Sequence, residues 1–245
     1  MTIQWYPGHM TRAKRMIVEQ LRVVDGVLEV VDARVPLSSR NPELKELSKK
    51  PQIIVLTKTD LADQAQTKRW IAHWASEGVE VVATNLLSGS GLAELRRLVE
   101  VTFPALKRPP RLLVVGIPNV GKSTLINGLT RRRGAQVGAR PGVTRGQVAR
   151  KLAAIASIRD EVFDQVEIAW WLVKFLHQEY PTALMERYGE LDPDNPLEDI
   201  GGKRGCLLRG GIVDLNQAAA IVLKDFRTGK LGFITLDNLE EGGKE

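Results

Sequence analysis

Residues 116–123 read GIPNVGKS and constrain the fold more than any other stretch of this chain. An apolar run at 112–115 precedes them, and a helix-forming segment follows at 124–127. The spacing G-x-x-x-x-G-K-[ST] lets a glycine-rich turn present backbone N–H groups to phosphate oxygens. In this phosphate-binding turn Lys122 reaches the β- and γ-phosphates, and the Ser123 hydroxyl is a ligand for Mg²⁺. The strand and helix on either side favour a nucleotide site in an α/β domain over a glycine-rich turn that binds nothing.

A second signal lies at the end of another apolar run, at residues 53–57. This predicted strand leads directly into Lys58, Thr59 and Asp60, and ligands bind at the carboxyl ends of strands in open α/β sheets. An aspartate there can accept hydrogen bonds from N1–H and the exocyclic amine of guanine, a donor pair that adenine lacks. Thr57 stands where asparagine is commoner, and its hydroxyl can tie this guanine loop (residues 57–60) to the phosphate-binding turn.

The order of the motifs is informative. A strand predicted at 79–84 leads into Asn85 and Leu86, where a backbone amide can touch the guanine oxygen. In an ordinary GTPase the phosphate-binding turn comes first and the guanine-reading residues come late. Here the guanine loop precedes the turn, and a Pro-Gly-x-Thr sequence at 141–144 follows it. That order indicates a circular permutation.

The distribution of charge says more than the net charge of +6. Residues 101–159 contain twelve lysines and arginines and no acid, whereas the next forty residues are acidic. A basic block beside a nucleotide site suggests a larger polyanion such as RNA, although a solvated surface is an equal alternative.

Composition excludes several classes of protein. One cysteine and three histidines cannot build a disulfide framework or a Cys/His zinc site. No apolar run approaches the roughly 20 residues that cross a bilayer, and the first residues lack a signal-peptide core. We expect a cytoplasmic protein without a membrane anchor.

Several stretches together resemble the circularly permuted GTPases, and more closely the bacterial ribosome biogenesis GTPase A family. Besides the phosphate-binding turn they are WYPGHM at 5–10, DARVP at 32–36, SSRNP at 38–42 and KRGC at 203–206. The resemblance runs nearly end to end. It implies a circularly permuted P-loop GTPase domain at 1–147, with a mostly parallel sheet and helices on both faces. A smaller all-helical domain at 148–245 follows and contacts RNA.

The resemblance also implies an activity and partners. We expect a GTPase that converts GTP to GDP with Mg²⁺ and K⁺, and that assists late maturation of the large (50S) ribosomal subunit. Its partners are the subunit precursor and its rRNA, the subunit stimulates its hydrolysis, and the protein itself is a monomer. The alternative is a nucleotide-gated RNA-binding scaffold without significant turnover. An ATP-using P-loop enzyme is disfavoured by Asp60.

Functional residues carry over only where the motifs match. His9 matches a histidine proposed to orient the attacking water, although a loop histidine beside Pro-Gly is commonly structural. Ser123 and Thr144 are the implied Mg²⁺ ligands, and Asn119 matches a position where related GTPases hold potassium. Lys203, Arg204 and Arg209 are the RNA candidates, with solvated turn charges as the alternative. The expected GTP-binding residues are Thr57, Lys58, Thr59, Asp60, Asn85, Leu86, Asn119, Val120, Gly121, Lys122, Ser123 and Thr124.

One departure from the family is large. After Thr144 the family has two strands and then Asp-Thr-Pro-Gly, whose aspartate contacts Mg²⁺ through water, but this chain passes directly to a predicted helix at 148. No acid lies between Glu100 and Asp160 to replace that aspartate. Without these strands the run at 112–115 becomes a sheet edge. We therefore hypothesise that a mobile switch segment after residue 147 is missing from this sequence.

Overall fold

The computed structural model describes residues 15, 17–42, 44–104, 108–130 and 146–242. The chain divides into two compact units, which are described separately. Among the described residues, those up to 130 and those from 235 to 242 form one unit, and residues 146–234 form the other. The domain boundary expected at 147 stays a prediction. Residues 235–242 were expected in the helical domain, but they group with the unit that contains the sheet.

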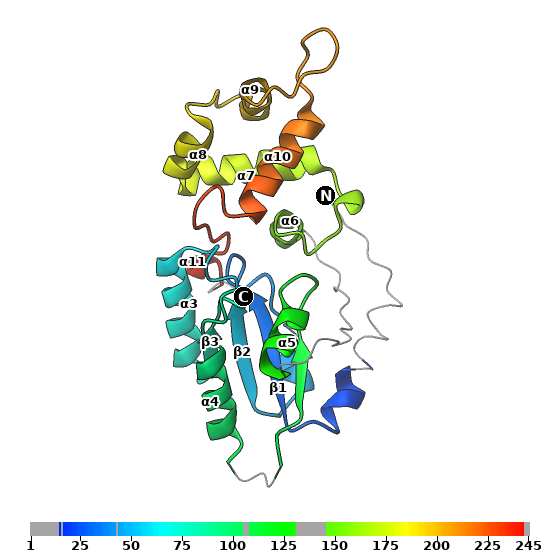
Figure 1. Ribbon diagram of the computed structural model, residues 1–245, viewed down its shortest axis with the longest axis vertical. Helices are drawn as coiled ribbons and strands as arrows, with labels where there is room; N and C mark the ends of the chain where they lie inside the picture. Colours follow the sequence, from blue (N-terminus) through cyan, green and yellow to red (C-terminus); the bar gives the residue numbers. More distant parts are fainter. Residues whose placement is uncertain (1–14, 16, 43, 105–107, 131–145, 243–245) are drawn as a thin grey trace. The chain divides into compact units, whose positions relative to one another are not determined.

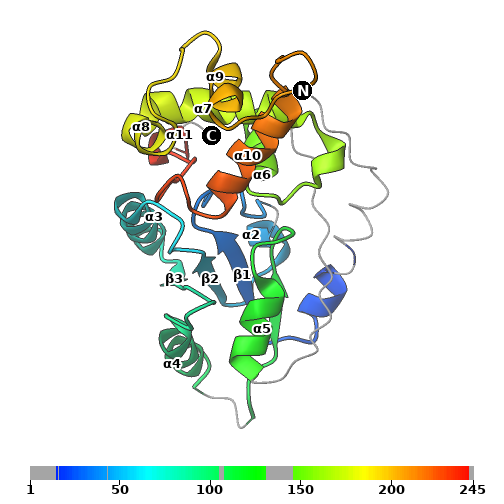
Figure 2. The same cartoon turned by 45° about the horizontal axis from the view of Figure 1, so that its top comes forward.

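The first unit is built on four parallel strands. They are β1 (Gly26–Asp32), β2 (Gln52–Thr57), β3 (Glu80–Ala83) and β4 (Leu112–Val115). Their order in the sheet is β3-β2-β1-β4. The helices of this unit are α2 (Leu44–Leu47), α3 (Gln64–Ser76), α4 (Leu92–Thr102), α5 (Lys122–Thr130) and α11 (Leu239–Gly242), and residues 17–21 are also helical. Figures 1 and 2 show α3, α4 and α5 beside the strands.

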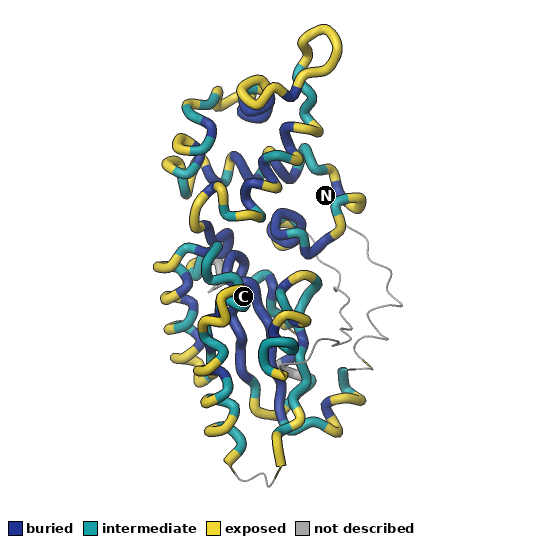
Figure 3. The backbone as a smooth tube through the Cα atoms, viewed as in Figure 1, coloured by how far each residue is buried: buried dark blue, intermediate teal, exposed yellow. Residues whose placement is uncertain are grey.

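Alternate residues of the strands face two cores. Leu28 and Val30 of β1 pack with Leu95 of α4 and Leu125 of α5, whereas Val31 lies in a second cluster with the tryptophans of α3. Every residue of β1 is buried, which explains its nearly continuous apolar run. Figure 3 shows the buried strands at the centre of this unit. The sheet therefore has helices on both faces, as expected.

Strand β4 is the outer strand of the sheet in the described part of the chain. It pairs with β1, with Leu112 opposite Gly26 and Val115 opposite Glu29. Three of its four residues are only partly buried. This is the edge position expected for a chain without the family's two additional strands.

The second unit is helical. Its elements are α6 (Gly146–Ala154), the 3₁₀ helix η1 (Asp160–Val162), α7 (Gln165–Glu179), α8 (Pro181–Tyr188), α9 (Pro196–Lys203) and α10 (Leu215–Arg227). Helix α7 contacts α6, α8, α9 and α10, so it forms the centre of this unit. The sequence GGKRGC at 201–206 predicts a basic glycine-rich turn, but residues 201–203 form the last turn of α9. A β-carbon on Gly201 would lie 2.3 Å from Val213 Cγ1, so the glycine allows close packing of α9 against the segment before α10.

Residues 235–242 return to the first unit. The backbone N–H of Leu236 donates to the carbonyl oxygen of Arg34 at 2.7 Å. The carboxylate of Asp237 accepts hydrogen bonds from Ser38 N and Ser38 Oγ, both at 2.7 Å. Residues 235–238 form no helix or strand and have no periodic pattern, so the sequence gives no sign that the segment leaves the helical domain. No helix in the described ranges is long and apolar enough to span a membrane.

Candidate nucleotide-binding site

The phosphate-binding turn connects β4 to α5, as its sequence predicts. A β-carbon on Gly116 would lie 2.5 Å from the carbonyl oxygen of Val30, so only glycine fits where the turn leaves the sheet. Lys122 begins α5 and its side chain is 4% exposed. The Lys122 ammonium donates to the carbonyl oxygen of Ile117, so this hydrogen bond closes the turn around the ammonium. Burial lowers the pKa of Lys122 to about 8.

The centre of this turn touches the loop after β3. Asn119 has φ +59° and Gly121 has φ +102°, both in the left-handed region. A β-carbon on Gly121 would lie 3.1 Å from Leu86 Cδ1. Leu86 and Gly121 were both expected at the nucleotide, and the structure brings them together although the sequence separates them widely.

Thr57 joins the guanine loop to the phosphate-binding turn. Its side chain is 1% exposed, and Oγ1 lies 2.7 Å from the carbonyl oxygen of Val120 and 3.1 Å from that of Val31. The expected connection by the threonine hydroxyl is therefore present. The buried hydroxyl can donate to either carbonyl oxygen, and its contact with Val120 fixes the end of β2 against the turn.

Lys58 makes the second connection between the two loops. Its ammonium donates to the carbonyl oxygen of Asn119 at 2.7 Å and lies 2.9 Å from Asp32 Oδ2. The backbone of Lys58 is left-handed, with φ +57°. Burial lowers the pKa of Lys58, and the neighbouring Asp32 opposes that shift.

Asp32 belongs to the DARVP motif, but the sequence analysis assigns it no role in the site. The structure places it there. Arg34 holds its carboxylate through the backbone N and Nε at 3.0 Å to Oδ1 and through Nη2 at 2.8 Å to Oδ2. Burial favours the neutral carboxyl, but Arg34 and Lys58 outweigh it and hold the pKa of Asp32 well below its ordinary value. The signal was a buried strand that ends in an acid at the edge where ligands bind.

Among the remaining described residues at this end of the site, only Asp60 offers a carboxylate that a ligand can contact. Thr59 Oγ1 donates to the carbonyl oxygen of Thr84 at 3.1 Å, which attaches the loop to the end of β3. Asn85 Oδ1 accepts from the backbone N–H groups of Leu87 at 2.9 Å and Ser88 at 3.2 Å. The carboxylate of Asp60 is partly exposed and has no hydrogen bond or ion pair with another described residue. It is free to accept hydrogen bonds from a ligand.

The described residues satisfy only part of an Mg²⁺ site. Ser123 and Thr124 lie exposed in the first turn of α5, and Ser123 offers its hydroxyl beside the positive helix end. Mg²⁺ usually takes one or two carboxylates besides phosphate oxygens. No cluster of acidic, histidine or cysteine side chains suited to a metal occurs in the described part of the chain. His9 and Thr144 lie outside the described residues.

The three RNA candidates lie exposed at the end of α9 and in the loop after it. Lys203 pairs with Asp199 at 3.4 Å, and its ammonium also donates to the carbonyl oxygen of Glu190. Arg204 donates to the carbonyl oxygen of Arg187 at 2.9 Å. Arg209 has no hydrogen bond or ion pair with a described residue, so its guanidinium is the one of the three most available to a partner.

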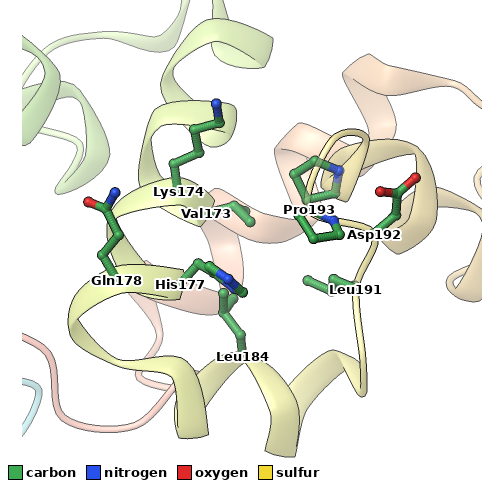
Figure 4. A pocket seen from close by; sticks show the side chains of 9 residues that line it. Val173, Lys174, His177, Gln178, Leu184, Leu191, Asp192 and Pro193 are labelled. Atoms are coloured by element: carbon green, nitrogen blue, oxygen red, sulfur yellow. The ribbon is translucent and has the colours of Figure 1, made fainter.

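A pocket of about 160 Å³ lies in the helical unit between α7, α8 and the loop before α9 (Figure 4). Lys174 and His177 of α7 line it, together with Asp192 of the loop. Ligand pockets usually measure about 300–1,000 Å³, so this pocket is too small for a nucleotide. It contains none of the predicted site residues.

Comparisons with known proteins agree with this geometry. The family described as 50S ribosome-binding GTPase matches residues 111–168. The chain is similar to ribosome biogenesis GTPase A of Bacillus cereus, with 38% identity over the whole chain and 97% of the relative. That alignment covers 286 positions, so the relative contains residues without a counterpart in this 245-residue chain.

Two solved structures have a similar fold. The GDP-bound structure of TM YlqF superposes with a TM-score of 0.70 and 28% identity, and covers 92% of this chain and 100% of that one. The GNP-bound YlqF from T. maritima gives a TM-score of 0.68 at 27% identity, with 93% and 98% covered. The match to the Bacillus cereus relative over nearly both full lengths is decisive. This chain belongs to the ribosome biogenesis GTPase A family.

Proposed function

We propose that this chain binds GTP and GDP between the guanine loop and the phosphate-binding turn, hydrolyses GTP, and acts in the late maturation of the large ribosomal subunit. The matched family is described as 50S ribosome-binding, and the relative from Bacillus cereus is named for ribosome biogenesis. The basic composition of residues 101–159 supports an RNA-containing partner. We further propose that the protein works as a monomer in the cytoplasm.

One observation carries the nucleotide proposal. Two hydrogen bonds, Thr57 to Val120 and Lys58 to Asn119, hold the guanine loop against the phosphate-binding turn. Asp60 then offers a carboxylate that no other described residue pairs with at one end, and Lys122 offers an ammonium with lowered pKa at the other. A guanosine phosphate has matching groups at its two ends, namely the N1–H and amine of the base and the anionic phosphates. Adenine would leave Asp60 without donors, which supports the preference for guanine.

Residues of this chain can orient the phosphates, but the hydrolytic step needs more. The N-terminal end of α5 and the Lys122 ammonium attract and position the γ-phosphate, with the Ser123 hydroxyl as one ligand for Mg²⁺ and Thr144 as the second. His9 is the proposed residue that orients water, and Asn119 the proposed contact for potassium. The family's metal-fixing carboxylate has no counterpart between Glu100 and Asp160, so the residues present do not complete an Mg²⁺ site.

The missing carboxylate supports the alternative function, a nucleotide-gated RNA-binding scaffold. A chain without the carboxylate would bind guanine nucleotides through the same two loops and switch between GTP and GDP without significant turnover. RNA contact through Arg209, with Lys203 and Arg204 beside it, serves either function. The intact mass of the natural protein distinguishes the cases, because a value near 27.2 kDa means that the switch segment is truly absent.

The experiment that tests the proposed function has two stages. Calorimetry with GDP, GTP and ATP should show binding of the guanine nucleotides alone, and equal binding of ATP would contradict the proposal. GTPase rates are then measured with and without purified large ribosomal subunits. Stimulation by the subunit, lost in His9→Ala, supports the hydrolysing assembly factor. No stimulation and no effect of His9→Ala favour the scaffold.

A further inference from the structure

We propose that Asp32 is a positioning residue of the nucleotide site, and that its carboxylate holds the Lys58 ammonium against the phosphate-binding turn. The inference rests on the proposed function, because it assigns a role within the same guanine nucleotide site. Asp32 ends β1 directly opposite Thr57, the last residue of β2. Lys58 follows Thr57, and its ammonium lies between Asp32 Oδ2 at 2.9 Å and the carbonyl oxygen of Asn119 at 2.7 Å.

The carboxylate of Asp32 is fixed before any nucleotide binds. It is 0% exposed, and three N–H groups of Arg34 hold both of its oxygens. The backbone N–H of Asp32 donates to Ser39 Oγ at 3.0 Å, which anchors the residue from the other side. Arg34 is anchored in turn, because its carbonyl oxygen accepts from Leu236 N at 2.7 Å. A carboxylate held in this way presents Oδ2 to Lys58 without further ordering.

Lys58 depends on this support for two reasons. Its left-handed backbone, at φ +57°, is unfavourable for a residue with a β-carbon and persists only where surrounding contacts determine it. Its side chain is partly buried, with the Arg34 cation as a like charge and Asp32 and Asp60 as the opposing charges. Without Asp32 the ammonium would face a like charge, and the guanine loop would lose one of its two connections to the turn. A nucleotide that spans both loops would then dissociate faster.

The same strand provides a matched control. Glu29, three residues before Asp32, is also 0% exposed and also holds an arginine, with Arg40 Nε at 3.0 Å and Nη2 at 2.9 Å. Its other partners are Asn41 N at 2.8 Å and the side-chain amide of Gln52 at 2.7 Å. Gln52 begins β2, at the opposite end of that strand from Thr57 and the guanine loop. Glu29→Gln therefore reproduces the loss of a buried carboxylate without disturbing Lys58.

The experiment compares Asp32→Asn, Glu29→Gln and wild type in the full chain. We measure the dissociation rate of fluorescent GDP, KM and kcat for GTP, and thermal unfolding without nucleotide. Asp32→Asn should release GDP at least about tenfold faster, the order expected for one charge-assisted hydrogen bond. It should raise KM with kcat unchanged, because the interaction is made equally in the ground and transition states. Glu29→Gln should lower the melting temperature and leave GDP dissociation unchanged.

A double variant tests whether Asp32 acts through Lys58. If it does, adding Asp32→Asn to Lys58→Met should leave the dissociation rate of Lys58→Met unchanged. If Asp32→Asn does not fold, the double variant Asp32→Asn/Arg34→Met takes its place. This double variant also removes the Arg34 cation that the Asp32 carboxylate neutralises. The inference is overturned if Asp32→Asn retains GDP like wild type, if Glu29→Gln accelerates release equally, or if the effect persists with Lys58→Met. Wild-type protein that fails to prefer GDP over ADP would instead overturn the proposed function itself.

Discussion

The side-chain oxygen of Thr57 lies 2.7 Å from the carbonyl oxygen of Val120, which is 63 residues later in the chain. The carbonyl oxygen of Val31 is also within reach at 3.1 Å, although one hydroxyl proton serves one acceptor at a time. The contact places the loop expected to read the base directly against the loop expected to hold the phosphates. The fold already orders both loops, so nucleotide binding loses less conformational entropy. More of the interaction energy with a nucleotide therefore contributes to affinity.

Replacing the Thr57 hydroxyl should therefore weaken nucleotide binding. Thr57→Val keeps the shape but leaves a buried carbonyl group without its donor, which costs about 1–3 kcal/mol. We expect GDP affinity to fall by roughly tenfold in calorimetry, since 1.4 kcal/mol corresponds to a factor of ten. Thr67→Val is the matched control, because Thr67 is buried in α3 and its hydroxyl donates to Asp63 O at 2.7 Å, away from the site. Equal GDP affinity in the two variants would contradict the role of Thr57.

Asp60→Asn should change which base is preferred. Xanthine carries a carbonyl oxygen where guanine carries its amine, so an amide side chain suits it better than a carboxylate does. We expect binding of GDP to fall and binding of xanthosine diphosphate to appear, measured by calorimetry with both ligands.

The control for this change lies three residues later. Asp63 caps α3, and its Oδ1 accepts from Ala65 N at 2.8 Å and Gln66 N at 3.0 Å. Asp63→Ala should cost about 1 kcal/mol of stability and leave the base preference alone. An unchanged guanine preference in Asp60→Asn would mean that Asp60 does not read the base.

The strands and the two motif loops could be predicted because their signals are local. Apolar runs mark β1, β2, β3 and β4, and the carboxyl ends of parallel strands meet at one edge. The meeting of Thr57 with the phosphate-binding turn followed from that rule. The site residues named from the family motifs at His9 and Thr144 lie outside the described residues and stay predictions.

What the sequence did not predict depends on contacts between distant residues. Arg34 was unassigned because an arginine after a strand is usually exposed, whereas here it is buried on Asp32. The return of residues 235–242 rests on pairs such as Ser38 and Asp237, which are 199 residues apart. No periodicity encodes such a pair, so a boundary drawn at the change from strands to helices assigned this segment to the wrong unit.

Removing the Asp237 carboxylate should destabilise the sheet unit. Its oxygens accept two hydrogen bonds from Ser38 at 2.7 Å, and the side chain is 2% exposed. Asp237→Ala leaves the Ser38 donors without partners, and we expect a loss of about 1.5–3 kcal/mol in urea unfolding. Asn238→Ala is the control, because within the described residues its Oδ1 accepts a single, longer hydrogen bond, from Glu240 N at 3.3 Å. Equal stability of both variants would show that the segment contributes nothing through Asp237.

Lys122 should make stability and nucleotide binding depend on pH in opposite directions. Burial lowers its pKa to about 8 from 10.5, so above pH 8 the folded chain holds fewer protons here than the unfolded chain. The contribution of Lys122 to the free energy of unfolding therefore rises between these two values. Phosphate groups favour the charged ammonium and raise its pKa. GDP binding should accordingly weaken above pH 8 and take up a proton.

Calorimetry in two buffers of different ionisation enthalpy measures this uptake. Near pH 8 we expect about half a proton per GDP, because a group with that pKa is half protonated before the ligand arrives. Lys122→Met should abolish most of the uptake and weaken binding, whereas Lys68→Met on the exposed face of α3 should keep both. Lys58, whose pKa is also lowered, would be the source if uptake survived in Lys122→Met. That result would move the ammonium that responds to nucleotide from the phosphate end of the site to the base end.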